Sequence, residues 1–297
     1  MMVRFPTKIL LATDGSEDAV LALRVAVDLS VGSGSELHVV HAWRAFPPYS
    51  HPAVAVSTDV GSYERAAQKI LFEQLDDVDA RGGSVAGAHP ERGQPVEVIS
   101  DLAEELGIGL VVMGSRGLGP LKRLLMGSVS AGVVDLASRP VLVARGGEDA
   151  WPPSRVVVGD DSSLGAKRAG EFAASIAGLV GAEVLLVRAL PVVLDVSDAG
   201  RFAEDATLPR QVVLGHHELS LRERASRLEE TSGLRPGVRL REGEAASVVL
   251  EAAEEGEWPA LVAVGRRGLG RLERLRLGSI STKVLRAATG PVLVCPS

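Results

Sequence analysis

The sequence predicts an α/β protein of two tandem domains, each an open, mostly parallel five-stranded sheet with helices on both faces. Two observations carry this prediction. Short runs rich in Val, Ile and Leu alternate with longer amphipathic segments, which is the pattern of parallel strands joined by helical crossovers. The same order of segments then repeats in the second half of the 297-residue chain.

The first half begins with a short apolar run and alternates from there. Its runs are apolar enough to be strands buried on both faces, whereas the longer segments carry apolar residues on one side only. The predicted strands lie near 8–13, 36–41, 85–89, 109–113 and 140–144, and the predicted helices near 16–31, 62–81, 95–106 and 128–138.

The second half repeats this order with similar segment lengths. Its predicted strands lie near 155–159, 183–188, 237–241, 260–264 and 291–295, and its predicted helices near 163–180, 216–232, 245–256 and 279–288. Because a crossover helix brings the chain back to the same end of the sheet, the strands within each half are expected to run parallel.

The two halves also match in local sequence, which indicates an internal duplication. LLATDGSEDA corresponds to VVVGDDSSLG, so that Asp14 aligns with Asp161, and SRPVLVA corresponds to TGPVLVC. Segment 145–154, RGGEDAWPPS, combines glycines, acids and prolines without apolar periodicity and is predicted to be the linker. We therefore expect domains over 1–147 and 152–297.

Composition restricts the class of protein. A formal net charge of −6 disfavours a general nucleic-acid binder, because such proteins carry basic surfaces that neutralise phosphates. Cys295 is the single cysteine, which excludes an intrachain disulfide and fits a reducing compartment. No apolar run approaches the roughly 18 residues of a membrane span, and the first residues lack the pattern of a secretory signal. We expect a soluble, cytoplasmic protein.

A glycine spacing recurs after the fourth predicted strand of each half. It consists of glycine, two residues, glycine, nine residues, then glycine and serine. Its members are Gly114, Gly117, Gly127 and Ser128 in the first half and Gly265, Gly268, Gly278 and Ser279 in the second. Glycine lets backbone N–H groups approach a ligand, and a serine at a helix start is placed to cap a terminus that favours anions.

Basic residues are concentrated in the same two segments of an acidic chain. They are Arg116, Lys122 and Arg123 in the first copy, and Arg266, Arg267, Arg271, Arg274 and Arg276 in the second. A glycine-rich turn that only connects a strand to a helix needs neither the positive charge nor the serine. The repeated spacing therefore predicts a phosphate-binding loop in each half.

With these residues each half resembles a universal stress protein domain of the ATP-binding branch, whose pattern is G-x2-G-x9-G-(S/T). The resemblance covers the whole chain as a tandem pair. It implies a Rossmann-like fold with strand order 3-2-1-4-5 and a nucleotide at the carboxyl edge of the sheet. The crevice of an open parallel sheet forms at the same place, between the first and fourth strands, where the strand order reverses.

The resemblance also implies two sets of site residues. The aspartate would lie near the ribose or adenine, and the residue after the second strand would lie against the base. The final glycine and serine of each motif, with the residue that follows them, would hold the phosphates. The first site would use Asp14, Ala42, Met113, Gly114, Gly117, Gly127, Ser128 and Val129, and the second Asp161, Ala189, Val264, Gly265, Gly268, Gly278, Ser279 and Ile280.

The expected function is an ATP-binding stress-response protein with one site per domain, acting as a nucleotide-dependent regulator or sensor. The ligand is ATP, ADP or AMP, expected with Mg²⁺. In the second copy Asp160 adjoins Asp161, where it would either bind a metal or repel a phosphate. No histidine stands in a motif relation to Ser128 or Ser279, so we predict no catalytic residue. Slow ATP hydrolysis and a nucleotide-free interaction module remain as alternatives.

Assembly is expected to follow from the fifth strands, PVLVA and PVLVC. The resemblance implies that two such strands meet about a pseudo-two-fold axis, so the tandem chain would mimic a dimer of single domains. Exposed strand edges that remain would then pair two chains as a homodimer, besides any protein partner that the sequence does not identify.

Overall fold

The computed structural model describes residues 5–44, 60–117, 126–191, 210–266 and 277–296. Within these ranges ten strands form one sheet. The strands are β1 (Lys8–Ala12), β2 (Glu36–Trp43), β3 (Val85–Arg92), β4 (Leu110–Gly114) and β5 (Val141–Ala144), then β6 (Arg155–Gly159), β7 (Glu183–Leu190), β8 (Gly237–Glu242), β9 (Leu261–Gly265) and β10 (Val292–Cys295).

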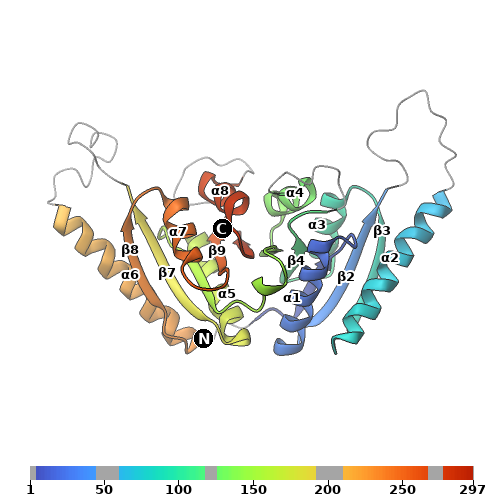
Figure 1. Ribbon diagram of the computed structural model, residues 1–297, viewed down its shortest axis with the longest axis horizontal. Coiled ribbons are helices and arrows are strands. Elements are labelled where there is room, and N and C mark those ends of the chain that lie inside the picture. Colours follow the sequence, from blue (N-terminus) through green and yellow to red (C-terminus); the bar gives the residue numbers. More distant parts are fainter. Residues whose placement is uncertain (1–4, 45–59, 118–125, 192–209, 267–276, 297) are drawn as a thin grey trace, which may run out of the picture.

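The strand order along the sheet is β3-β2-β1-β4-β5-β10-β9-β6-β7-β8. Each half therefore has the order 3-2-1-4-5, and all pairs within a half are parallel. The two halves join through an antiparallel pair, β5 with β10, in which Val143 is opposite Val292 and Val141 is opposite Val294. The expected meeting of the fifth strands is confirmed, and the two sheets form one continuous sheet with the halves on either side of this junction (Figure 1).

Helices cover both faces of the sheet. They are α1 (Glu17–Ser33), α2 (Val60–Ala80), α3 (Pro95–Glu105), α4 (Ser128–Leu136), α5 (Leu164–Val180), α6 (Arg210–Ser232), α7 (Ala245–Glu254) and α8 (Ser279–Ala287), with a short 3₁₀ turn η1 (Glu148–Ala150). One core lies under α1, α2, α5 and α6, and a second under α3, α4, α7 and α8. Both cores include residues of both halves, so the junction is buried on each face.

The capping residues explain why α1 and α5 begin and end at equivalent places. Ser16 and Ser163 are the N-caps, and their hydroxyls accept hydrogen bonds from Ala19 N and Ala166 N. Gly34 and Gly181 end the two helices with φ of 73°, a left-handed conformation that glycine adopts without strain. The duplicated sequence therefore repeats the capping residues of its helices as well as its strands.

The main difference from the sequence prediction is the start of α6. The helix begins at Arg210 and not near 216. Gly215 and the histidines that follow it lower the local helix propensity, but propensity is a weak preference that neighbouring turns override. His216 and His217 consequently lie within the helix and not at its start.

The segment between the halves is anchored to the first one. Trp151 is buried, and its indole Nε1 donates to Asp28 Oδ2 on α1 at 2.9 Å. Arg24 Nη1 on the same helix donates to the Glu148 carbonyl at 3.0 Å. The connection between the halves is therefore part of the packed structure.

Candidate functional site

The loops after β1 and β4 face each other at the carboxyl edge of the first half. Ala12 and Met113, at the ends of these neighbouring strands, are register partners. Asp14 and Gly117 follow them, and a Cβ at Gly117 would lie 2.2 Å from Asp14 Oδ2. Three helical crossovers separate these two residues in the sequence, and the fold brings them together where the strand order reverses.

Asp14 is held in a tight turn before α1. Its Oδ1 accepts a hydrogen bond from Ser16 N at 3.1 Å, and Gly15 between them has a φ of 74°. The second half repeats the turn, because Asp161 Oδ1 accepts from Ser163 N at 3.0 Å. There the intervening residue is Ser162, which adopts a φ of 68° despite its side chain. The two aspartates therefore have the same local orientation.

The first glycine of each motif is required for packing. A Cβ at Gly114 would lie 2.8 Å from the backbone carbon of Asp18, and a Cβ at Gly265 would lie 2.7 Å from that of Gly165. Both contacts are with the first turn of a helix, α1 or α5. Glycine lets that helix approach the end of the strand closely, a role that needs no ligand.

The serines of the motif do not cap their helices, which corrects the sequence prediction. Gly127 and Gly278 are the N-caps of α4 and α8, and neither helix has a side-chain cap. Ser128 and Ser279 are the first helical residues and are exposed. A glycine N-cap leaves the first N–H groups without an acceptor from its own side chain, so each terminus presents donors and a positive dipole end.

Sequence reasoning missed a buried serine two positions further on. Ser130 Oγ donates to the Gly114 carbonyl at 2.8 Å, and Ser281 Oγ donates to the Gly265 carbonyl at 2.7 Å. These bonds tie the start of each motif to the helix that ends it. The repeated strings GSVS and GSIS were the available signal.

Arg116 is paired within its own half. Its guanidinium donates to both carboxylate oxygens of Asp18, at 3.0 and 3.1 Å, and Ser115 Oγ donates to the same carboxylate at 2.5 Å. The hydrogen bond to Asp18 raises the pKa of Arg116 above its usual value. The other predicted basic residues, apart from Arg266, lie outside the described ranges, as does Gly268.

The remaining predicted residues line the same edge in both halves. Ala42 and Ala189 lie near the ends of β2 and β7 and are half-buried, whereas Met113 and Val264 are buried at the ends of β4 and β9. Val129 and Ile280, in the first turns of α4 and α8, pack partly against the core beneath these helices. The fold therefore gathers an aspartate, apolar side chains and a helix N-terminus around each crevice.

Comparison with known proteins identifies the family of both halves. The model of the universal stress protein family matches residues 6–145 and again residues 153–296. The chain belongs to the universal stress protein family. A universal stress protein of Mycolicibacterium smegmatis is 35% identical over 188 residues, a match that covers 62% of this chain and 60% of that protein.

Other universal stress proteins match one half or the fold alone. A Bacillus subtilis member is 32% identical over 152 residues, covering 46% of this chain and 98% of its own length. The crystal structure of a member from Archaeoglobus fulgidus superposes with a TM-score of 0.64 and covers 99% of this chain and 97% of that chain at 23% identity. At that identity the likeness establishes the tandem fold only.

The second half of this universal stress protein departs from the first behind the site. Asp160 is buried and accepts from Arg188 Nη2 at 2.6 Å, while Arg224 Nε lies 2.9 Å from its other oxygen. The first half has Thr13 at this position, with its hydroxyl donating to Gln74 Oε1 at 2.8 Å. Asp160 is thus committed to two arginines, which corrects the expectation that it would bind a metal or repel a phosphate.

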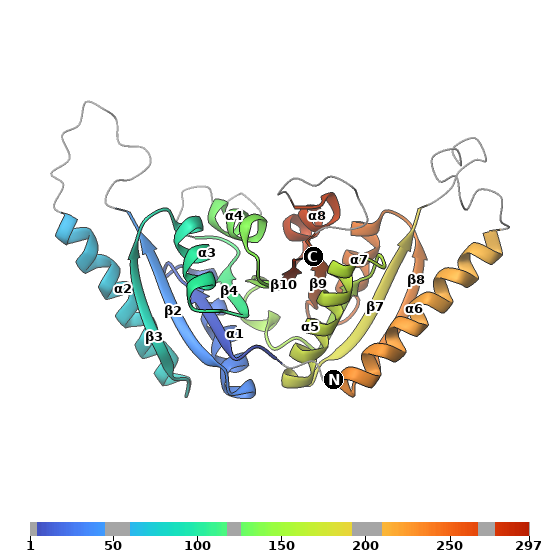
Figure 2. The ribbon, with the colours of Figure 1, turned by 180° about the vertical axis from the view of Figure 1, so that it is seen from behind.

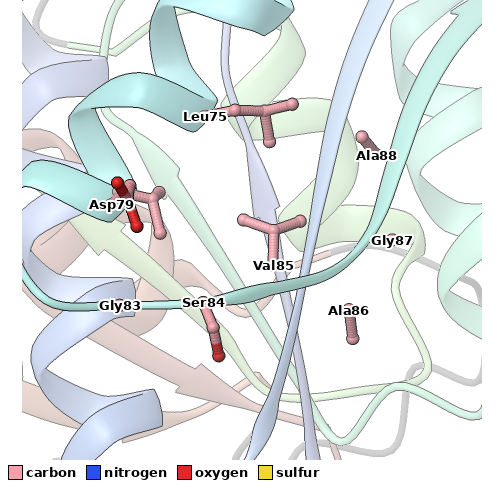
Figure 3. A pocket seen from close by; sticks show the side chains of 9 residues that line it. Leu75, Asp79, Gly83, Ser84, Val85, Ala86, Gly87 and Ala88 are labelled. Carbon is pink, nitrogen blue, oxygen red and sulfur yellow. The ribbon is translucent and has the colours of Figure 1, made fainter.

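A cavity of about 400 Å³ lies elsewhere, between α2 and the first residues of β3 (Figure 3). Its lining is small and apolar apart from Asp79 and Ser84, and it includes none of the predicted site residues. In the described part of the chain no three His, Cys, Asp or Glu side chains are grouped to hold a metal ion. None of the described helices combines the length and apolarity needed to span a bilayer.

Proposed function

We propose that each half of this chain binds one adenine nucleotide, ATP in the first instance, and that occupancy regulates a stress-response function. The observation that carries the proposal is the apposition of Gly117 to Asp14 beside the N-terminus of α4, which has a glycine N-cap. A bare backbone, a carboxylate and an anion-favouring helix terminus are the groups that a nucleotide needs at the edge of a parallel sheet.

In the first site the phosphates would lie at the N-terminus of α4. The N–H groups of Ser128 and Val129 and the exposed Ser128 hydroxyl would donate to phosphate oxygens, and Gly117 would let the loop backbone approach them. Asp14 would accept from a ribose hydroxyl, with Ala42 and Met113 on the side of the base. Gly114 and Gly127 would shape the loop that holds these groups.

The second site would use the equivalent groups. Asp161 has the turn geometry of Asp14, and Gly278, Ser279 and Ile280 begin α8 as their counterparts begin α4. Ala189, Val264 and Gly265 would complete the side of the base. Gly268 would take the role of Gly117.

Magnesium would enter with the nucleotide. The described residues offer no cluster of three His, Cys, Asp or Glu for a resident metal. Mg²⁺ retains several waters and commonly binds through one or two carboxylates and substrate phosphates. Phosphate oxygens and water would therefore supply most of its ligands here.

We favour regulation over catalysis because the motif supplies phosphate donors without a recognisable general base, and the nearby Asp14 and His41 make contacts that hold the turn after β1. Asp14 Oδ1 accepts from Ser16 N, and His41 Nδ1 on the neighbouring strand donates to the Thr13 carbonyl at 2.8 Å. Hydrolysis needs an oriented water and a group that accepts its proton. We propose slow turnover at most, with bound nucleotide biasing the choice of a protein partner.

We propose that the whole chain forms a homodimer through surfaces other than the fifth strands. β5 and β10 pair with each other inside the chain, so β3 and β8 are the outermost strands. Light scattering at several concentrations tests this proposal. A constant mass near the 31.1 kDa of one chain would contradict it, and twice that mass would support it.

The nucleotide proposal is tested on the natively purified protein. Mass spectrometry after denaturation should detect co-purified ATP or ADP, and calorimetry on the stripped protein should give up to two adenine nucleotides per chain. GTP and inorganic phosphate serve as controls for base and phosphate recognition. Absence of adenine nucleotide in both experiments would leave the interaction module as the function.

A further inference from the structure

Asp135 belongs to the first half of the chain but contacts the glycine motif of the second. It lies in the last turn of α4, and its Oδ1 accepts a hydrogen bond from the backbone N–H of Leu277 at 2.7 Å. Leu277 directly precedes Gly278, the N-cap of α8. The bond therefore fixes the chain at the entrance to the second anion-favouring helix terminus.

The other described end of the same motif is held at the same turn of α4. Arg266, next to Gly265, donates through Nη1 to the Asp135 carbonyl at 3.2 Å and to the Ala137 carbonyl at 2.7 Å. A guanidinium is favourable at a helix C-terminus, where the last carbonyls lack partners within the helix. Figures 1 and 2 show α4 and α8 on either side of the junction.

The loop of the first motif is fixed by an aspartate of the same half and not by one of the opposite half. Asp18 on α1 accepts from Ser115 and Arg116, and Ser16 Oγ donates to the Arg116 carbonyl at 3.1 Å. In the second half Gly165 aligns with Asp18 and Arg266 with Ser115. A glycine has no carboxylate, so this way of holding the loop does not exist there.

Arg145 of the first half donates to the Leu285 carbonyl in the last turn of α8, but the contact made by the Asp135 carboxylate has no counterpart there. The position in α8 that aligns with Asp135 is Arg286, which has no acceptor on its side chain. A basic residue in the last turn is what the helix dipole favours, whereas an aspartate there is unfavourable. The contact with Leu277 gives this unfavourable charge a structural role.

We infer that Asp135 is a positioning residue of the second nucleotide site, contributed by the opposite half of the chain. The inference rests on the proposed function. Asp135 acts through Leu277 and Arg266 and need not touch the nucleotide. The second site is then complete only when the halves are docked, whereas the first is positioned within its own half.

The test uses the full chain with the first site weakened by Gly117→Val, so that calorimetry with ATP separates the tighter second site from the first. Asp135→Ala should weaken binding about tenfold, since a lost hydrogen bond to a charged group costs roughly that factor. Asp135→Asn keeps an oxygen acceptor and should restore most of the affinity. Asp18→Ala, the matched control, should leave the second site unchanged.

Hydrogen exchange without nucleotide supplies a second readout. The Leu277 amide should exchange faster in Asp135→Ala than in the parent or in Asp135→Asn. If the parent binds ATP and Asp135→Ala binds it equally well, the inference is overturned and the proposed function stands. If the unmodified protein binds no nucleotide, the proposed function fails and the role of Asp135 fails with it.

Discussion

Gly117 stands against the carboxylate of Asp14, so closely that a Cβ at Gly117 would lie 2.2 Å from Asp14 Oδ2. The two residues follow neighbouring strands, β1 and β4, whose ends are in register. Any larger residue at 117 must displace either the loop or the aspartate.

Gly117→Val should therefore weaken nucleotide binding in the first half only. We expect the affinity of the first site to fall at least about tenfold, or about 1.4 kcal/mol, because the side chain keeps the loop backbone away from the nucleotide and displaces Asp14. Calorimetry resolves the two sites. Gly215→Ala, in α6 where the added Cβ would meet no atom within 4 Å beyond its chain neighbours and its own helix backbone, is the control and should bind normally. Equal losses in both halves would contradict the assignment.

ATP turnover should be slow, below about one per second, because donors for phosphate are present without a recognisable general base. Phosphate release measured with and without Mg²⁺ checks this. A fast Mg²⁺-dependent rate that disappears in Asp14→Asn or Asp161→Asn would identify the protein as an enzyme.

Ser130→Ala should destabilise the fold, and Ser128→Ala should not. The Ser130 hydroxyl is buried and donates to the Gly114 carbonyl, so its loss should lower the free energy of unfolding by about 1 kcal/mol. Ser128 is exposed at the start of α4, and its removal should change stability by less than about 0.5 kcal/mol. Urea denaturation compares the two. Similar values for both variants would argue that the Ser130–Gly114 hydrogen bond does not stabilise the fold.

Val292→Asp should disrupt the junction of the halves. Val292 is fully buried opposite Val143 in the β5–β10 pair, where a charge has no partner. We therefore expect the free energy of unfolding to fall by on the order of 3 kcal/mol or more. Val141→Asp should behave similarly. Val212→Asp, at an exposed position in the first turn of α6, is the control. Thermal unfolding and small-angle scattering report stability and domain pairing, and unchanged values would refute the edge-strand argument.

Cys295 should resist thiol reagents while the protein is folded. Burial in β10 raises the pKa of its thiol from 9.0 to about 12. The folded state therefore retains this proton where the unfolded state loses it, and the contribution to stability falls as pH rises from about 9 towards 12. Labelling at pH 9 should be slow without urea and rapid with it. Rapid labelling of the folded protein would show that the strand opens.

Local patterns in the sequence were sufficient to predict the helices and strands and to recognise the duplicated motif. Strands such as β4 and β5 are continuous apolar runs, and the Ser and Gly caps of α1 and α5 lie next to the residues they serve. Strand order came from the family resemblance, which the topology confirms. The start of α6 was misplaced because Gly215 weakened a local signal that the surrounding helix outweighs.

The partners of the site residues were decided only by the tertiary structure. Asp18 meets Arg116 across 98 positions, Asp160 meets Arg188 across 28, and Asp135 meets Leu277 across 142. The sequence alone does not distinguish an aspartate that faces a ligand from one that pairs with an arginine or binds the backbone of another domain. Its partner depends on which strands are neighbours and how the helices pack on them, and periodicity and spacing carry no information about such distant contacts.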